Sequence, residues 1–427
     1  MKFIPILLFL FLALHADIQL IKKENKDSNT TLLIIGGIHG NEPGGYETAS
    51  ILATHYTITS KNLWIVPNLN KDSIRNDVRG INGDMNRKFA YIKKNDKDRA
   101  IIEAIKKIIT NKKVSLILNL HDGHGFYREK YKNSILNPKA WGQTCVIDQC
   151  KLDTNQEFGN LDEIASLVKN RVNKDLLNNS HVFNVKNTNT KIDDKQMQLS
   201  LTYYAIRHNK PAFAIETSKS LKTVAQKVFY QLTAIEEFMN IAGIKYERNF
   251  ELNIQSISKI VKNYGFLNIN DNIKFDLTNI KNSLSYIPIK SSNNKFKFSN
   301  PLGDIEKKHG RYDIYIASRK VVSLKPQYFR IDDTCFENFK AIVDGKEVVL
   351  QKTSNFYAKK SFKIENLDGI RVNVIGFSAR NRKNESGVTI YKNSLLRNYS
   401  VDTKNKVYRI EFYKKKKFCS MSTVTFQ

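Results

Sequence analysis

Residues 32–45, LLIIGGIHGNEPGG, constrain the fold and the chemistry of this chain more than any other stretch. The leucines and isoleucines at its start predict a short buried strand. The strand ends at His39, Glu42 follows three residues later, and a Pro-Gly-Gly turn opens a helical pattern over 47–54. An imidazole nitrogen and a carboxylate on one side of such a turn are two ligands that Zn²⁺ accepts. Because His-x-x-Glu is a short pattern, ordinary polar residues of a surface loop are the alternative interpretation.

Buried strands and helices alternate from this stretch to about residue 243. Apolar runs at 63–67, 114–120 and 211–215 predict strands, and the patterns at 97–109, 161–177 and 221–241 predict helices. The alternation predicts an α/β domain over 17–243 with a mixed, largely parallel sheet flanked by helices. Ligands of open α/β sheets bind at the carboxyl ends of strands, where His39, His121 and Glu216 fall. Residues 122–160 lack periodicity, and a loop of that length is usually functional or disordered.

The remainder of the chain has the texture of an all-β protein. Short alternating segments with turn signals replace the helical patterns, and RVNVIGF at 371–377 and VYRIEFY at 407–413 are typical strands. Asp344-Gly345 lies between AIV and KEVVL and predicts a two-residue hairpin. The length suggests two small domains, 244–325 and 326–427, joined near Lys325-Pro326. We expect the last one to be a β-sandwich of the immunoglobulin-like type.

The first sixteen residues predict a secretory signal peptide. A lysine at position 2 precedes an almost wholly apolar run over 3–14, and small residues follow at Ala13 and Ala16. A buried N-terminal helix is the alternative, but the apolar run has no polar face. No later apolar run is long enough to cross a bilayer. We therefore expect the chain to be exported to the periplasm.

The net charge of +28, from 69 Lys+Arg against 41 Asp+Glu, favours an anionic partner. Nucleic acid is not that partner, because the lysines are scattered and no nucleic-acid module is recognisable. A polyanionic wall polymer or a membrane surface fits an exported protein better, and a biased genome composition is the alternative explanation. The charge predicts no particular fold.

The four cysteines form an even set, as is common in exported proteins. Of the three possible connectivities, we predict pairs between Cys145 and Cys150 and between Cys335 and Cys419. Metal binding by these cysteines is a weaker alternative, since neither pair has finger-like spacing or histidines in register.

A loop rich in arginine follows the first strands. In the sequence VRGINGDMNRKF, residues 78–89, Arg79 and Arg87 flank Asp84 and Asn86. Arginine suits bidentate recognition of a carboxylate, and the asparagine can donate a further hydrogen bond. The alternative is a solvated basic loop in a basic protein.

Two further strands end in candidate catalytic side chains. LILNLHDGHGFY, residues 116–127, brings His121 to the carboxyl end of a strand, and His124 lies in the glycine-rich loop beyond it. We take His121 as the third metal ligand and His124 as a rim residue. PAFAIETS, residues 211–218, ends in Glu216, whose burial can raise its pKa into the range of a general base.

These four motifs in order resemble the zinc carboxypeptidase superfamily over residues 30–240. With the signal peptide, the LHDGHGFY loop and the trailing β domains, the chain is most similar to the cell-shape-determining murein D,L-carboxypeptidases of helical Gram-negative bacteria. The resemblance implies that His39, Glu42 and His121 hold Zn²⁺. It also implies that Glu216 is the general base and that Arg79 stabilises the oxyanion of the tetrahedral intermediate.

The same resemblance implies a substrate site. Asn86 and Arg87 would bind the terminal carboxylate, and Trp141 and Thr202 would line the pocket, although a core role for Trp141 is an open alternative. The tyrosine that digestive carboxypeptidases place over the substrate has no firm match in SLTYYA, residues 200–205, where Tyr203 and its neighbour are the candidates.

Three functions remain in view. The first is a periplasmic enzyme that trims murein tripeptides to dipeptides by removing terminal diaminopimelate, with possible wall or cell-shape proteins bound by the β domains. The second is an N-acyl amino acid deacylase of the aspartoacylase and succinylglutamate desuccinylase type, which is cytosolic and has no signal peptide. The third is an inactive wall-binding scaffold, which would not need a complete set of ligands, arginines and base.

Overall fold

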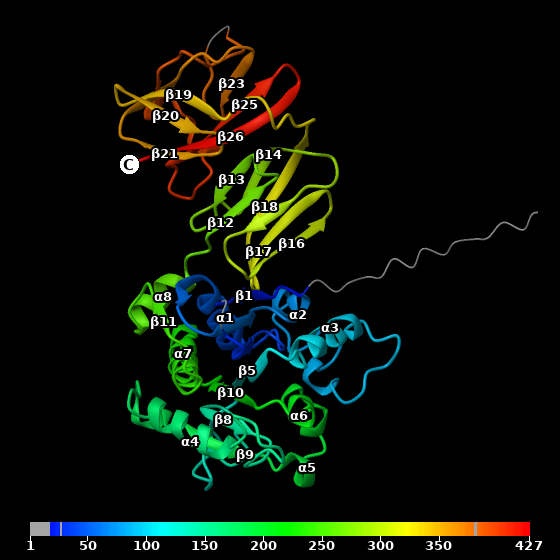
Figure 1. The fold of residues 1–427 in the computed structure, drawn as a ribbon. Helices are drawn as coiled ribbons and strands as arrows, with labels where there is room; N and C mark the ends of the chain where they lie inside the picture. Colours follow the sequence, from blue (N-terminus) through cyan, green and yellow to red (C-terminus); the bar gives the residue numbers. More distant parts are fainter. Residues whose placement is uncertain (1–17, 26–27, 380–381) are drawn as a thin grey trace, which may run out of the picture. The chain divides into compact units, whose positions relative to one another are not determined.

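The computed structural model describes residues 18–25, 28–379 and 382–427, and Figure 1 shows its elements. The chain forms two compact units that join between residues 258 and 259. The predicted signal peptide, 1–16, lies outside the described residues. Within the described ranges, no helix has both the length and the apolar character needed to cross a membrane.

A seven-stranded sheet forms the centre of the first unit. Its order is β1 (Ile21–Lys23), β4 (Asn62–Val66), β2 (Thr31–Ile35), β5 (Val114–Gly123), β10 (Ala212–Ser218), β8 (Thr144–Ile147) and β9 (Asn184–Asn187). The central strands β4, β2, β5 and β10 run parallel to one another. Strand β1 is antiparallel to β4, and β8 is antiparallel to β10 but parallel to β9. Strands of a parallel sheet are covered on both faces, which explains their nearly continuous apolar sequences. The predicted α/β domain is confirmed.

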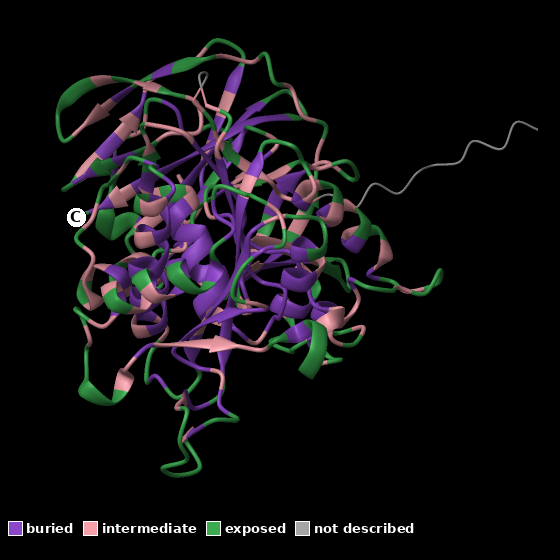
Figure 2. Cartoon of the chain, turned by 60° about the horizontal axis from the view of Figure 1, so that its bottom comes forward, coloured by how far each residue is buried: buried purple, intermediate pink, exposed green. Residues whose placement is uncertain are grey.

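Helices cover both faces of this sheet. The helices α1 (Pro43–His55), α4 (Leu161–Val172) and α7 (Val224–Ile241) pack on one another and on the sheet. On its other side lie α3 (Arg99–Ile109) and α6 (Leu201–Arg207) (Figure 1). Figure 2 shows the buried residues concentrated in the sheet and in the helix faces against it. Phe213 on β10 packs on Phe238 of α7, so the alternate residues of β10, including Glu216, face away from α7.

Short elements complete the first unit. They are the strands β3 (Tyr56–Ile58), β6 (Phe126–Tyr127), β7 (Leu136–Asn137) and β11 (Tyr246–Arg248), the helices α2 (Lys71–Arg75) and α5 (Thr190–Asp193), and 3-10 turns at Met85–Arg87, Asn179–His181 and Met197–Leu199. Helix α8 (Ile254–Val261) spans the junction of the units.

Two expectations for the first unit need correction. The helix predicted over 161–177 ends at Val172, where Asn173 closes its last turn by donating to the carbonyl of Lys169 at 3.0 Å. The stretch 122–160, which lacks periodicity, contributes the buried strand β8 to the sheet. A strand of four residues is too short for its alternation to be recognised in the sequence.

The second unit is built almost entirely of strands. One sheet has the order β15 (Phe296–Phe298), β12 (Phe266–Ile269), β13 (Ile273–Asp276), β26 (Lys417–Phe426), β25 (Val407–Lys414) and β23 (Ile370–Val374). Strand β21 (Asn355–Ala358) also pairs with β26, beyond the residue that pairs with β13. A second comprises β14 (Ser283–Ile289), β18 (Arg319–Tyr328), β17 (Arg311–Ile316) and β16 (Gly303–Lys308). A third comprises β20 (Lys346–Gln351), β19 (Asn338–Val343), β22 (Ser361–Ile364) and β24 (Ile390–Tyr391). Short 3-10 turns lie at Lys392–Ser394 and Arg397–Tyr399.

The expected all-β character of this part is confirmed, including the hairpin at Asp344-Gly345. These two residues connect β19 and β20 with φ values of 50° and 83°, the left-handed conformations that a tight hairpin turn requires. One buried cluster draws Phe339 from the third sheet and Phe412 from the first, so two sheets share a core. The domain junction predicted near Lys325-Pro326 falls inside β18. Strand β26 pairs with strands that precede this junction in the sequence and with strands that follow it. The domain boundaries themselves stay predictions.

One of the two predicted disulfides is confirmed. Cys335 and Cys419 are bonded, with their Cα atoms 5.9 Å apart. The pairing of Cys145 with Cys150 is wrong, because both are free. Strand β8 holds the Cys145 side chain inside the sheet, whereas Cys150 is exposed beyond the strand, where its Sγ accepts a hydrogen bond from Asn187 Nδ2 at 3.2 Å. Proximity in sequence misleads here.

Candidate metal centre and substrate pocket

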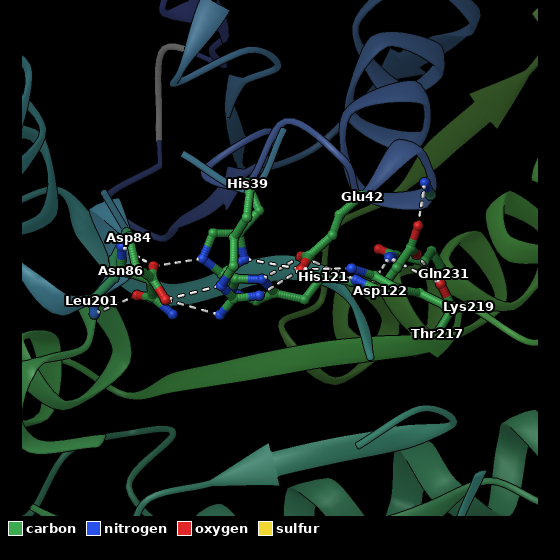
Figure 3. Close-up of polar contacts among 12 residues, drawn as sticks. His39, Glu42, Asp84, Asn86, His121, Asp122, Leu201, Thr217, Lys219 and Gln231 are labelled. Atoms are coloured by element: carbon green, nitrogen blue, oxygen red, sulfur yellow. Dashed lines mark hydrogen bonds and ion pairs between the residues drawn. The ribbon is translucent and has the colours of Figure 1, made fainter. Parts of the chain in front are cut away.

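Three side chains converge where β2 and β5 end (Figure 3). His39 Nδ1 lies 3.0 Å from Glu42 Oε1, and His121 Nδ1 lies 2.8 Å from Glu42 Oε2. All three residues are buried, and one donor atom from each lies within 4.8 Å of the others. Burial alone would raise the pKa of Glu42, but the two imidazoles hold it well below its usual value. One carboxylate and two imidazoles thus surround a common position, which we call the metal focus.

The turn between β2 and α1 places the first two of these ligands. A Cβ at Gly40 would lie 2.0 Å from the backbone carbonyl oxygen of Ser73, so only glycine fits there. Glu42 is the residue before α1, and Pro43 occupies the first helical position, where its fixed φ suits the helix. The separation of His39 and Glu42 is therefore set by a tightly packed turn.

Asp84 and Arg79 hold the ligands from outside. Asp84 Oδ1 lies 2.8 Å from His39 Nε2, and Arg79 donates to Asp84 Oδ2 at 3.0 Å and to Glu42 Oε1 at 3.2 Å. Burial opposes ionisation of Asp84, yet His39 and Arg79 hold its pKa well below the usual range. A carboxylate that accepts the Nε2 proton leaves the Nδ1 lone pair of His39 directed at the focus. The donor set therefore fits a metal such as zinc.

The Asp122 carboxylate connects the end of β5 to helices α1 and α7. It accepts from Gly44 N at 2.9 Å and from the Thr217 hydroxyl, and it lies 3.4 Å from Lys227 Nζ. Burial raises the pKa of Asp122, while the lysine and the hydrogen bonds favour the ionised form. Since Asp122 directly follows His121, these contacts fix the end of β5 that carries this ligand.

Replacing Asp122 with alanine should lower the free energy of unfolding by about 3–5 kcal/mol, because the buried Lys227 ammonium would lose its counter-charge. Urea denaturation of the metal-free protein measures this change. The control is Asp175→Ala, which breaks an exposed pair with Arg171 and should cost less than about 1 kcal/mol. Equal losses in the two variants would contradict the anchoring role.

Glu216 lies beside His121 because β10 and β5 pair in parallel with these two residues in register. Among the described residues its carboxylate has no hydrogen-bond partner, and burial, reinforced by Glu42 and Asp122, raises its pKa to about 7. A carboxylate with such a pKa exchanges protons readily near neutral pH. The pairing thus places a proton acceptor next to the metal focus.

If Glu216 is the base, it works only when ionised, so kcat/KM should fall about tenfold for each pH unit on the acid side. The midpoint should lie no higher than about 7, because a cation at the focus favours the ionised form and can only lower the pKa. A pH profile of hydrolysis by the metal-loaded protein measures this limb. A rate that rises as the pH falls below 7 would show that the protonated form is the active one.

A pocket of about 250 Å³ opens beside the metal focus. Its lining includes the predicted residues Arg79, Asn86, Arg87, Trp141, Thr202 and Glu216 together with the three ligands. Tyr203 is buried at 8% exposure and does not line this pocket, and neither does Tyr204. His124 is exposed on the lining, outside the cluster of ligands. The structure thus gathers the predicted site residues in one place, apart from the tyrosine.

Asn86 is oriented by a contact from α6. Its Oδ1 accepts a hydrogen bond from Leu201 N at 2.9 Å, and Nδ2 has no acceptor among the described residues. Arg87 donates to the carbonyl of Asn86 at 3.0 Å, and Met197 Sδ lies 3.8 Å from its Nη2. Both side chains can therefore offer further donors to an anionic group in the pocket.

Seven lining residues were not predicted from the sequence as parts of the site: Asn119, Asp122, Gly123, Val146, Met197, Ala214 and Lys219. Lys219 lies 3.6 Å from Glu42 Oε1, and Asn119, Val146 and Ala214 form part of the pocket wall. Asn119 precedes His121 by two residues and so shares its face of the sheet. That spacing is a signal by which sequence reasoning could have found it.

Two family models match the chain in sequence order. The catalytic model of carboxypeptidases that control helical cell shape matches residues 3–262, and a model of the C-terminal domain of metallo-carboxypeptidases matches residues 332–427. The first match alone covers more than half of the chain. The chain belongs to the family of carboxypeptidases that control helical cell shape. The predicted resemblance is therefore confirmed.

Solved structures of one member of this family resemble the whole chain. The mDAP-bound form of Helicobacter pylori Csd4, a D,L-carboxypeptidase, is 35% identical over 95% of this chain and 100% of that chain, with a TM-score of 0.88. The tripeptide-bound form of this cell shape determinant is 34% identical over 96% and 100% of the two chains, with a TM-score of 0.87. No curated protein sequence matches the chain. The similarity extends through both units.

Proposed function

We propose that this chain is a zinc-dependent D,L-carboxypeptidase that removes terminal diaminopimelate from murein tripeptide stems and leaves dipeptides. The observation that carries the proposal is the convergence of His39, Glu42 and His121 beside Glu216 in a pocket that also contains two arginines. Full-length similarity to a D,L-carboxypeptidase with mDAP and tripeptide complexes supports the substrate class. The same similarity favours a wall peptide over the N-acyl amino acids of the deacylase alternative.

The residues at the focus suit zinc. His39 and His121 would each contribute Nδ1 and Glu42 would contribute carboxylate oxygen, a ligand set that leaves a position for water or substrate. When bound, zinc supplies Lewis acidity that polarises the scissile carbonyl and makes water a better nucleophile near neutral pH.

The neighbouring side chains supply the remaining chemistry. Glu216 takes the proton of the attacking water and returns it to the leaving amine of diaminopimelate. Arg79, which donates to Glu42 and Asp84 in the free site, can turn its guanidinium to the oxyanion of the tetrahedral intermediate. Its half-exposed position at the pocket leaves room for that change.

Asn86 and Arg87 bind the free carboxylate that makes the enzyme an exopeptidase. Asn86 Nδ2 and the guanidinium of Arg87 both belong to side chains that line the pocket, and two such donors match the two oxygens of a carboxylate. Trp141 and Thr202 form the adjoining wall, and the Lys186 ammonium stacks on the Trp141 ring at 4.2 Å.

Export to the periplasm remains part of the proposal and rests on the N-terminal sequence. The immunoglobulin-like class of the last β-sandwich is likewise proposed, on the shared core of its two sheets. The β unit would give the enzyme a surface for wall polymers or cell-shape proteins, in keeping with the strongly basic chain.

The decisive experiment is incubation of the zinc-loaded protein with purified muropeptides. Tripeptide stems should be converted to dipeptides with release of diaminopimelate, and a chelator should stop the reaction. Undiminished turnover after complete metal removal would contradict the role of zinc. Failure to cleave the tripeptide at any metal content would contradict the substrate assignment.

A further inference from the structure

A second pocket, of about 380 Å³, lies within the β unit, Lys259–Gln427. It is found at a fork in the first sheet of that unit. Strand β13 pairs with β26 only at Ile273 and Met421, whereas β21 pairs with the same edge of β26 from Thr423 onwards. Because both strands run parallel to β26, β13 must leave the edge that β21 occupies, and residues of both strands line the pocket. We call it the fork pocket.

Two aromatic side chains line the fork pocket and are exposed to solvent. Tyr357 on β21 is 59% exposed, and Phe266 on β12 is 43% exposed. The Lys274 ammonium of β13 lies 4.4 Å from the centre of the Phe266 ring. Aromatic rings in a concave surface are typical of ligand sites. The pocket therefore offers two rings to a ligand that has an apolar face.

Polar side chains in the same pocket have unused hydrogen-bonding capacity. Asn355 Oδ1 accepts from the hydroxyls of Thr423 at 3.0 Å and Thr425 at 2.9 Å, while its Nδ2 has no acceptor among the described residues. Asp276 accepts from Thr278 N at 2.8 Å through one carboxylate oxygen, and its other oxygen has no donor within the described ranges. A ligand with hydroxyl and amide groups can satisfy both.

The charges of the fork pocket are mixed, with a small excess of cations. Three lysines line it, Lys274, Lys404 and Lys406, and none of them forms an ion pair within the described part of the chain. Two carboxylates, Asp276 and Asp402, line it as well. Asp402 accepts from the backbone N–H groups of Lys404 at 3.1 Å and Lys406 at 2.8 Å, so the loop itself uses much of its hydrogen-bonding capacity. The pocket therefore suits a ligand with few negative charges.

This combination matches a chain of N-acetylated sugars that bears carboxylates on its branches. The apolar face of a pyranose ring packs on an aromatic ring, whose face carries a partial negative charge that attracts C–H groups. The hydroxyl and acetamido groups need the donor and the acceptor that Asn355 and Asp276 supply. Single-stranded nucleic acid fits less well, because every nucleotide brings a phosphate charge close to the two carboxylates.

We infer that the fork pocket binds the glycan strand of murein, a chain of N-acetylated sugars with carboxylate-bearing branches. The inference rests on the proposed function, which makes murein the polymer that the enzyme meets, and adds to it a second binding site for the same polymer. Attachment to the strand raises the effective concentration of the peptide stems that the strand carries.

The probe is a soluble murein glycan strand from which an amidase has removed all peptide stems. This treatment leaves a free lactyl carboxylate on alternate sugars and no bond that a carboxypeptidase can cleave. The full chain should bind the strand, and Tyr357→Ala should weaken the binding about tenfold or more, as expected when an aromatic ring is no longer buried by the ligand. Isothermal titration calorimetry with the strand measures both dissociation constants.

Tyr328→Ala is the matched control for this variant. Tyr328 also lies on a strand of the β unit and is 50% exposed, but it does not line the fork pocket. The control variant should bind the strand as tightly as wild type. Equal weakening in the two tyrosine variants would overturn the inference.

The lysines are tested with the same strand and with its methyl ester, in which the carboxylates are uncharged. Replacing Lys404 and Lys406 together with glutamine should weaken binding of the free strand about fivefold, as expected for two exposed ion pairs, and should not weaken binding of the ester. Lys346→Gln changes an exposed lysine outside the pocket and should alter neither affinity. An equal loss for strand and ester in the double variant would contradict the inference.

Three further outcomes separate this inference from the proposed function. If the wild-type chain cleaves murein tripeptide but does not bind the strand, the inference fails while the proposed function stands. If it binds a single-stranded oligonucleotide at least as tightly as the strand at the same salt concentration, the pocket belongs to another polymer and the inference fails. If it binds the strand as expected but cleaves no tripeptide, the proposed function fails while the glycan site is retained.

Discussion

Replacing Glu216 with glutamine should lower kcat by about 10²–10⁴-fold while zinc content stays unchanged. Glutamine keeps the size of the side chain and can occupy the same space, but it cannot accept a proton from water. The loss should appear in kcat more than in KM, since substrate contacts are retained. Stopped-assay rates with murein tripeptide, together with elemental analysis of the purified variant, measure both parts of this expectation.

The same variant makes a prediction about stability that separates catalysis from folding. Because burial raises the pKa of Glu216 to about 7, its ionised form is disfavoured in the folded protein. Stability that Glu216 contributes below its unfolded pKa is therefore lost as the pH rises through about 7. The metal-free glutamine variant should be at least as stable as wild type at pH 8. A variant that is both inactive and unstable at that pH would not support a catalytic role.

A surface substitution provides the control for this experiment. Glu103→Gln removes the same charge from the exposed side of α3, where the carboxylate pairs with Arg99. Its kcat should equal that of wild type, because an exposed i,i+4 pair contributes only about 0.3–0.5 kcal/mol to stability and lies outside the pocket. Near-normal turnover in Glu216→Gln would leave the site without its proposed base.

The second large effect concerns Arg87 and the free end of the substrate. Arg87→Ala should lower kcat/KM for tripeptide by about two to three orders of magnitude, since losing a buried charge-assisted contact costs about 2–5 kcal/mol. Zinc content should not change, because Arg87 contacts none of the three ligands. Steady-state kinetics and metal analysis on the same preparation test both statements. The matched control is Arg99→Ala on α3, which should keep wild-type kcat/KM.

Longer stems test the same claim without mutation. In tetra- and pentapeptides D-alanine caps the diaminopimelate carboxylate, so the wild-type enzyme should leave them uncleaved. Efficient cleavage of a pentapeptide would mean that the Arg87 loop does not recognise a chain terminus. An endopeptidase would then replace the carboxypeptidase as the function of this pocket.

Short-range patterns in the sequence predicted the central buried strands and the three candidate ligands. Continuous apolar runs identify strands that are buried on both faces, and His39, His121 and Glu216 each stand at the end of such a run. Parallel strands bring their carboxyl ends to one edge of the sheet, so these three side chains, far apart in the sequence, are expected to lie together. His121 and Glu216 are direct neighbours because of the register in which β5 and β10 pair. No local sequence pattern predicts that register.

Contacts that depend on packing could not be predicted in this way. The hydrogen bond between His39 and Asp84 joins a turn to a loop forty-five positions away, and the sequence offers no periodicity that links them. Tyr203 stands in a plausible motif but is turned into the core by α6. The mistaken pairing of Cys145 with Cys150 has the same cause, since nearness in sequence does not say which side of a strand faces the interior.

The position of β26 bears on how the protein is made. This strand is paired with β25 along one edge and with both β13 and β21 along the other, so it closes a sheet whose first strands are synthesised much earlier. Until β26 is available to pair, β13 has an unpaired edge, and such edges invite pairing with other chains. Contacts between distant parts of a sequence also form slowly. We therefore expect the β unit to fold only after its synthesis is nearly complete, and to depend on chaperones in the interval.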